Sequence, residues 1–351
     1  MNKAELLNKV KNVYSERQLI ASLRRDKLLA SYRESHPQQA QRLESQAESR
    51  WEDLSNILEL AAKNALAEAE GSFSKLSTLP AQSKHPISAA PNNSSFELPE
   101  FNEIYKNIYK STNFCELCND TAIYNGGKCP KCFNATWIKV LRDNIDPLLP
   151  LAEHNFTNFD LNIFSDDTVE TAVGKVKPKD QIQGILDLAK QFLTDFPKSS
   201  DNLFFTGRAG TGKTYLAECI ANAVLEENYL ALVLNMLKIE EIINNLRTRQ
   251  RSFSTKAEQL SKAQNDYNLL LEADLLVIDD LGLQTDLLTN PLAELIAILR
   301  ERNINNKVTI ITSNYDIRDL KKVFDERLFS RLMQNFKMLP FVGEDLRLKR
   351  R

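Results

Sequence analysis

No apolar run in this sequence approaches the length that a membrane-spanning helix needs. The first ten residues, MNKAELLNKV, carry charges and lack the apolar core of a secretory signal. Charge of one sign is not in excess either, because 45 lysines and arginines face 47 acidic residues. This balance excludes a wholly basic nucleic-acid coat protein but allows a local basic patch. These absences predict a cytoplasmic protein that has no membrane partner.

Glycine is absent from residues 3–69, a segment rich in Leu, Ala, Glu, Arg and Lys. Apolar residues recur there at helical spacing, and a break near Pro37 is typical of the start of a second helix. We therefore predict a helical N-terminal arm over residues 1–70. Its apolar stripe packs either within the arm, as a coiled coil, or on a partner. Residues 71–98 are rich in serine and contain three prolines, which predicts a flexible linker.

Four of the five cysteines form two C-x2-C pairs with ten residues between them. Four thiolates at this spacing can close a tetrahedral Zn²⁺ site, and such a site is structural because it leaves no open position. A redox dithiol is the alternative, but neither pair has the strand-helix context of a redox motif. We predict a zinc-binding module over residues 99–140, which binds protein or nucleic acid. The predicted ligands are Cys115, Cys118, Cys129 and Cys132.

A glycine-rich turn follows a short apolar run in residues 203–214, LFFTGRAGTGKT, and a stretch with helical periodicity comes next. Strand, glycine turn and helix in this order predict a P-loop, which binds a polyphosphate through backbone N–H groups. Lys213 would reach the β- and γ-phosphates of ATP, and the Thr214 hydroxyl would ligate Mg²⁺. An ordinary glycine turn is the alternative. The predicted nucleotide-binding residues are Gly207, Arg208, Ala209, Gly210, Thr211, Gly212, Lys213 and Thr214.

Polar residues follow two further apolar strands, which we expect at 275–278 and 308–312. A carboxylate at the C-terminal end of a strand beside the P-loop can hold Mg²⁺, and a second one can orient or deprotonate the attacking water. We assign Asp279 to Mg²⁺ and Asp280 to the water. Asn314 could contact both this water and the γ-phosphate, although alone it would be read as a turn residue.

Arg327 and Arg331 lie four residues apart in FDERLFSRL and share one face of the expected helix. An arginine held away from its own P-loop could reach the nucleotide of a neighbouring subunit. A surface salt bridge is the alternative for both residues. We assign the catalytic finger to Arg331, with Arg327 left open, and expect self-association through the ATP sites.

In combination these motifs resemble those of the AAA+ ATPases, and more narrowly of the bacterial replicative helicase loaders of the DnaC type. The resemblance covers about residues 110–351 and includes the cysteine pairs, GRAGTGKT, LLVIDDLG, TIITSN, ERLFSRL and FVGEDLRLKR. It implies an α/β core over residues 150–351, a parallel sheet with helices on both faces. A helical lid is not expected, because only about twenty residues follow the arginine motif. The family's Walker A, Walker B, sensor and finger roles would fall to Lys213 and Thr214, Asp279, Asn314 and Arg331.

The resemblance implies an ATPase that loads a replicative ring helicase onto single-stranded DNA, in replication initiation or restart. The N-terminal arm would hold the helicase. Many AAA+ proteins have glutamate where this chain has Asp280, which is shorter by one methylene, and this difference implies slow, switch-like hydrolysis. Basic residues in a helical insertion over 237–273 could neutralise DNA phosphates, with a solvated loop as the alternative. These residues are Arg247, Arg249, Arg251 and Lys256.

Three other functions stay open at this point. A transposition helper ATPase of the insertion-sequence type would have a similar core and would bind duplex DNA and a transposase. Its core needs no helical arm, linker or zinc module, so these segments favour the loader. A metabolic P-loop kinase or GTPase is less consistent with the sequence, which has no NKxD guanine signature. The last alternative is an adaptor in which nucleotide only stabilises the fold.

Overall fold

The structure is a computed structural model. It describes residues 2–38, 41, 112–171, 174–198, 201–252, 255–282, 291–323 and 326–348. The predicted linker, most of the second half of the predicted arm and the start of the predicted zinc module lie outside these residues. The chain divides into two compact units, residues 1–14 with 122–351 and residues 15–121.

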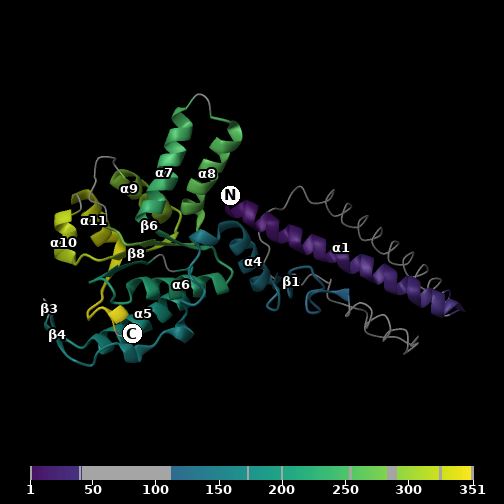
Figure 1. Cartoon of the computed structure of the whole chain (residues 1–351), viewed down its shortest axis with the longest axis horizontal. Coiled ribbons are helices and arrows are strands. Elements are labelled where there is room, and N and C mark those ends of the chain that lie inside the picture. The colour runs from purple at the N-terminus through teal and green to yellow at the C-terminus, as the bar shows by residue number, and fades with distance from the viewer. Residues whose placement is uncertain are drawn as a thin grey trace, which may run out of the picture. The chain divides into compact units, whose positions relative to one another are not determined.

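A sheet of five parallel strands forms the centre of the first unit, in the order β6-β7-β8-β5-β9 (Figure 1). Strands β5 and β8 are buried along their whole length, as parallel strands are when helices cover both faces. The strands are β5 (Asn202–Thr206), β6 (Ala231–Asn235), β7 (Leu275–Asp279), β8 (Val308–Ser313) and β9 (Phe336–Pro340).

Helices cover both faces of this sheet. Helices α5 (Pro178–Asp195) and α6 (Lys213–Glu226) lie on one face, and α7 (Met236–Arg251), α8 (Ala257–Glu272) and α9 (Pro291–Ile304) lie on the other (Figure 1). Right-handed crossovers require this arrangement, because the chain runs from β5 out to β6 and then returns through β7 to β8. The reversal brings the C-terminal ends of β5 and β8 together at a switch point, where ligands bind in open α/β sheets. The prediction of a parallel α/β sheet is confirmed.

The chain from β8 to β9 runs through α10 (Ile317–Val323) and α11 (Glu326–Asn335). After β9 the structure describes eight residues, which include one 3₁₀ turn, η4 (Leu346–Leu348). Phe341 N–H donates to the Thr206 carbonyl oxygen at 2.6 Å, so this last segment continues along β5 toward the P-loop. Within the described residues, therefore, no helical lid follows the core.

The segment that precedes the core packs on α6 and β6. Its helix α4 (Phe133–Ile145) buries Trp137 and Leu141 completely or almost so. Its short elements are hairpin β1–β2 (Ile123–Tyr124, Gly127–Lys128), the 3₁₀ turns η1 (Asp146–Leu148), η2 (Phe156–Asn158) and η3 (Leu161–Ile163), and hairpin β3–β4 (Val169–Thr171, Gly174–Val176).

The first turns of α1 (Lys3–Ser35) belong to the same unit as the sheet. Leu6 and Val10 are buried, and Lys3 Nζ lies 2.6 Å from Asp274 Oδ2. The Tyr14 hydroxyl lies 3.3 Å from Thr136 Oγ1 on α4. The sequence leaves open whether this stripe packs within the arm or on a partner, and its N-terminal part packs on the core of its own chain instead.

In the second unit, Arg24 of α1 lies over the Phe114 ring at 5.0 Å. The Asp120 carboxylate accepts hydrogen bonds from the backbone N–H groups of Phe114 and Cys115, and so orders the loop of the first cysteine pair. Helix α1 ends at Ser35, close to the break expected near Pro37. Among the described helices of both units, none combines the length and apolar character required to cross a membrane.

Candidate functional site

The glycine-rich turn between β5 and α6 has two glycines against which the segment after β9 packs. Gly207 and Gly210 have φ of +136° and +75°. A Cβ on Gly207 would lie 2.2 Å from the carbonyl oxygen of Phe341, and one on Gly210 would lie 1.9 Å from Asp345 Oδ1. At Gly207 the approach of backbone atoms and the backbone conformation both exclude a side chain. At Gly210 the backbone conformation disfavours a side chain, and Asp345 would have to move. The turn and the C-terminal segment therefore form one packed structure.

Lys213, the first residue of α6, turns its ammonium back into this loop. Its Nζ donates to the carbonyl oxygens of Gly207 and Arg208, each at 2.7 Å, and to Asn314 Oδ1 at 3.0 Å. Burial lowers the pKa of Lys213 to about 8, although the nearby Asp280 and Asp279 oppose the shift. A cation at the N-terminus of a helix, beside a glycine-rich turn, forms a site for an anion such as phosphate.

Two hydroxyl groups hold the Asp279 carboxylate at the end of β7. Thr214 Oγ1 donates to Asp279 Oδ1 at 2.8 Å, and Thr312 Oγ1 donates to the same oxygen at 2.6 Å. Burial raises the pKa of the Asp279 carboxyl, and these hydrogen bonds oppose the shift. Hydroxyl and carboxylate oxygens are the hard ligands that Mg²⁺ prefers, so Thr214 and Asp279 fit the metal that the sequence predicts for them.

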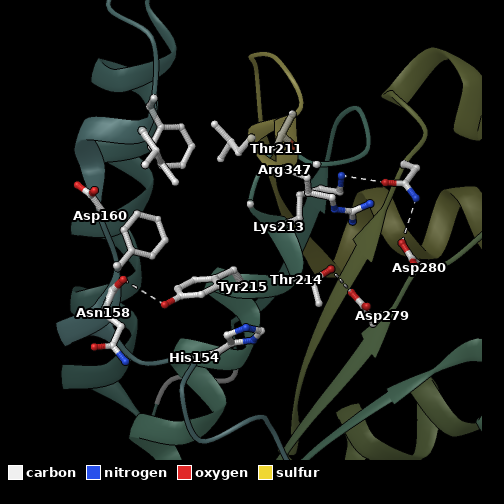
Figure 2. Close-up of a pocket in the computed structure, with 17 residues that line it drawn as sticks. His154, Asn158, Asp160, Thr211, Lys213, Thr214, Tyr215, Asp279, Asp280 and Arg347 are labelled. Carbon is white, nitrogen blue, oxygen red and sulfur yellow. Dashed lines mark hydrogen bonds between the residues drawn. The ribbon is translucent and has the colours of Figure 1, made fainter. Parts of the chain in front are cut away.

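Asn314, at the end of β8, connects the lysine to the second carboxylate. Its Oδ1 accepts from Lys213, and its Nδ2 donates to Asp280 Oδ1 at 3.0 Å. Asp280 has φ of +55°, an uncommon conformation for a residue other than glycine. The P-loop lysine, both carboxylates and the amide therefore meet at one edge of the sheet, as Figure 2 shows for Lys213, Asp279 and Asp280.

These groups line a cavity of about 330 Å³ that extends away from the carboxylates to an aromatic wall (Figure 2). The His154 and Tyr215 rings lie 4.4 Å apart, and Phe159 stacks on Phe164 at 6.0 Å. Aromatic faces of this kind stack on a planar base. Thr211 and Thr214 line the other part of the cavity. The cavity therefore combines an apolar aromatic end with a cationic, glycine-rich end, which fits a nucleotide.

No sequence motif predicted this aromatic wall. Buried Glu218 on α6 holds it in place, since its Oε2 accepts from Leu151 N–H at 2.7 Å and lies 3.0 Å from His154 Nδ1. Burial raises the pKa of Glu218, and the contacts with the Leu151 N–H and His154 oppose the shift. The aromatic run upstream of the core, HNFTNFDLNIF, is the only sequence signal, and it has no fixed spacing to the P-loop motif.

Arg347 also lies at the cavity although no sequence motif predicted a role for it. It belongs to η4 and lines the cavity together with Lys213 (Figure 2). The positive charge of Arg347 contributes to the lowered pKa of Lys213. The sequence FVGEDLRLKR contributes to the family resemblance but does not by itself place Arg347. The chain packs on Gly210 at Leu346, and this contact brings Arg347 to the cationic, glycine-rich end of the cavity.

Several predicted residues do not line the cavity. Gly207, Arg208 and Ala209 belong to the turn but lie outside the cavity wall. Arg331 is half-buried on α11 and is also absent from the wall. The side chain of Arg327 lies outside the described residues.

The four residues of the predicted basic segment have different surroundings in the structure. Helices α7 and α8 extend side by side away from the sheet (Figure 1). Arg247, in the second half of α7, pairs with Glu294 on α9. Arg249 Nη1 donates to Gln259 Oε1 on α8 at 2.9 Å, whereas Arg251 and Lys256 are exposed. Arg247 thus has a structural contact that the sequence did not predict.

Cys115, Cys118, Cys129 and Cys132 form a group that could hold a metal ion. Four thiolates are the ligand set of a structural tetrahedral zinc site. Tyr14 OH lies 3.2 Å from Cys132 Sγ, a contact suited to a ligand thiolate. The cluster is therefore compatible with the predicted zinc module.

Comparison with known proteins agrees with this geometry. Residues 179–351 match the model of the family described as IstB-like ATP binding protein. They are an IstB/DnaC family domain. Together with the five-stranded parallel sheet, this match identifies an AAA+ P-loop-like fold.

Among curated proteins, the chain is 28% identical over 147 residues to "Replicative helicase loader DnaC" of Escherichia coli K12. It is 27% identical over 148 residues to the protein of that name from Buchnera aphidicola subsp. Schizaphis graminum. Each match covers 42% of this chain, and the chain spans 56% of the length of these relatives. The crystal structure of the DnaC helicase loader aligns with 55% of this chain and 100% of its own, at 23% identity and a TM-score of 0.38.

Proposed function

We propose that this protein is an ATPase that loads a replicative ring helicase onto single-stranded DNA during replication initiation or restart. The observation that carries the proposal is the 28% identity over 147 residues to "Replicative helicase loader DnaC". The convergence of Lys213, Asp279, Asp280 and Asn314 around one cavity supports ATP as its ligand.

In this proposal the P-loop and Lys213 bind the ATP phosphates, and the aromatic wall receives the base. Mg²⁺, held by Thr214 and Asp279, would neutralise phosphate charge. Asp280 orients the attacking water and accepts its proton, while Asn314 and Arg347 contact the γ-phosphate. Because the Asp280 side chain is short, hydrolysis is slow and serves as a switch.

Arg331 would complete the site of a neighbouring subunit, so that ATP favours self-association. Residues 1–70 would bind the ring helicase. The exposed basic residues near the end of the α7–α8 pair would bind the DNA strand through its phosphates. The domain limits 1–70, 71–98, 99–140 and 150–351 remain predictions that accompany this proposal.

The test is loading of the ring helicase from the same source onto a single-stranded DNA circle by the intact protein. We expect the protein to co-purify with the helicase, and ATP to increase the amount of helicase that elutes with the DNA. Arg331→Ala should retain ATP binding and lose this increase. If the intact protein fails to bind the helicase with or without ATP, the loader proposal is wrong.

The match to the IstB-like family favours one second candidate, the transposition helper ATPase of the insertion-sequence type. This candidate requires binding to duplex DNA and to a transposase. Capture of a transposase but not a helicase from the same source, with a preference for duplex over single-stranded DNA, would support it over the loader.

Charge reversal at Arg251 and Lys256, which are both exposed, should lower single-stranded DNA affinity by at least about tenfold at low salt. The slope of log affinity against log salt should also become shallower by about 1 to 2, since fewer phosphates are neutralised. Arg247 is left intact because it pairs with Glu294, and Arg249 is left intact because it donates to Gln259. The matched control is Lys190→Glu with Lys198→Glu, an equal charge change at exposed residues outside the α7–α8 pair. Equal loss in both double variants would exclude a specific DNA contact at the end of the α7–α8 pair.

For the zinc module we expect one zinc ion per chain and a defined pattern of thiol reactivity. A chelator should release the metal and make four thiols reactive in the folded protein. Cys219 should stay unreactive until the protein unfolds, because it is buried and burial raises the pKa of its thiol to about 12. Titration with a thiol reagent measures the count, and Cys219→Ala should leave the four unchanged. Four reactive thiols before chelation would contradict the zinc prediction.

A further inference from the structure

Thr312, the fifth residue of β8, contacts both of the neighbouring carboxylate residues and has no exposed surface. Its Oγ1 donates to Asp279 Oδ1 at 2.6 Å and accepts from the backbone N–H of Asp280 at 3.0 Å. One hydroxyl can make both contacts because it has one proton and two lone pairs. The side chain of Thr312 therefore fixes the positions of the Asp279 carboxylate and the Asp280 peptide relative to β8.

The turn after β7 needs such support, because Asp280 has a φ of +55°. Residues other than glycine keep this conformation only where surrounding contacts enforce it. Two further hydrogen bonds hold the turn, from Leu281 N–H to the Thr312 carbonyl oxygen at 2.8 Å and from Ser313 Oγ to the Leu281 carbonyl oxygen at 2.7 Å. These two contacts hold the backbone after the carboxylates, whereas the Thr312 hydroxyl acts on the carboxylate residues themselves.

The other hydroxyl on Asp279 Oδ1 belongs to Thr214. In the proposed function the Thr214 hydroxyl ligates Mg²⁺. Its hydrogen bond to Asp279 would then differ between the metal-free and the metal-bound site, so Thr214 does not orient the Asp279 carboxylate in both. Thr312 has no exposed surface, and its hydroxyl is already committed to Asp279 and Asp280. It can therefore keep the same contacts through binding and hydrolysis.

We infer that Thr312 is a positioning residue for the hydrolysis of ATP. Its hydroxyl orients the Asp279 carboxylate toward the metal position and holds the Asp280 backbone so that the Asp280 side chain meets Asn314. This inference rests on the proposed ATPase function, and it assigns a specific task to a residue of the TIITSN motif for which the sequence predicted no role.

The test compares three variants of the full chain. Thr312→Val keeps the shape of the side chain and removes the hydroxyl, and Thr312→Ser keeps the hydroxyl. Ser313→Ala is the matched control, because it removes a hydroxyl bond from the same turn without touching Asp279 or Asp280. The measurements are ATP affinity in EDTA, the Mg²⁺ concentration that gives half-maximal ATP binding and hydrolysis, kcat, and the thermal unfolding midpoint.

We expect Thr312→Val to keep its ATP affinity in EDTA within about twofold. Its Mg²⁺ midpoint should rise and its kcat should fall, each by about 10- to 100-fold, the range for a lost hydrogen bond to a charged group. Thr312→Ser should lie within a few-fold of the wild type. Ser313→Ala should leave the Mg²⁺ midpoint unchanged even where it lowers the unfolding midpoint.

An unchanged Mg²⁺ midpoint and kcat in Thr312→Val would overturn the inference. Equal changes of the Mg²⁺ midpoint and kcat in Thr312→Val and Ser313→Ala would also overturn it, because they would indicate a structural role. If Thr312→Val does not fold, Thr312→Ala takes its place. If the wild-type protein binds ATP with Mg²⁺ but does not hydrolyse it, the proposed ATPase activity fails, and the Mg²⁺ midpoint for binding still tests Thr312.

Discussion

Replacing Asp280 with asparagine should lower the rate of ATP hydrolysis by about 10²- to 10⁴-fold, the usual contribution of a general base. The amide oxygen of asparagine can still accept the hydrogen bond that Asn314 Nδ2 donates to Asp280 Oδ1. The local geometry therefore persists, and what disappears is the carboxylate that accepts the proton of the attacking water. ATP affinity should stay within a few-fold of the wild type. Phosphate release and binding of a fluorescent ATP analogue measure the two effects separately.

The matched control is Asp316→Asn, which makes the same chemical change two residues after Asn314. Asp316 Oδ1 accepts a hydrogen bond from Asp319 N–H at the start of α10, and asparagine can accept it equally well. This variant should therefore hydrolyse ATP at the wild-type rate. Asp280→Glu restores the residue that many AAA+ proteins carry and should keep measurable turnover. Hydrolysis by Asp280→Asn at the wild-type rate would show that another group activates the water.

Replacing Gly207 with alanine should lower the free energy of unfolding by about 2–4 kcal/mol. The new Cβ would lie 2.2 Å from the Phe341 carbonyl oxygen, at a φ of +136° that alanine rarely adopts. Backbone cannot rotate away as a flexible side chain can, so the C-terminal segment must move off the P-loop. ATP affinity should fall with stability, because this segment carries Arg347 into the cavity. Chemical denaturation and ATP titration measure the two effects.

Gly184→Ala provides the control for the same substitution at a permissive site. Gly184 lies in α5, and nothing lies within 4 Å of the position of its added Cβ. Alanine there should raise the free energy of unfolding by about 0.5–1 kcal/mol, because it reduces the backbone entropy of the unfolded chain. If Gly207→Ala is as stable as the wild type, the C-terminal segment does not pack on the P-loop as described.

Local sequence was sufficient to predict that the groups proposed to bind phosphate and metal lie together. A strand followed by a glycine turn and a helix sets its own geometry, and carboxylates that end a parallel strand must lie at the same edge as the P-loop. Lys213, Asp279, Asp280 and Asn314 therefore meet as their order along the chain suggests. Their catalytic roles remain proposals that the variants above test.

The residues that complete the cavity could not be found in this way. Most of the aromatic wall lies in residues 154–164, upstream of the P-loop, and Glu218 holds it through contacts with Leu151 and His154, which are 67 and 64 residues earlier in the chain. Arg347 reaches the phosphate end only because the chain after β9 continues along β5. Such contacts depend on the packing of segments far apart in the chain, and no spacing rule within either segment encodes them.

The sequence by itself determined the parallel α/β core, the P-loop with its two carboxylates, and the paired cysteines, because short-range geometry and strand order dictate them. Only the tertiary structure decided that the start of α1 packs on the core and that Arg247 pairs with Glu294. It also decided that Thr312 holds both carboxylate residues. The physical reason is that an apolar stripe, a cation or a hydroxyl is compatible with many partners, and only the packed sheet and helices select one of them.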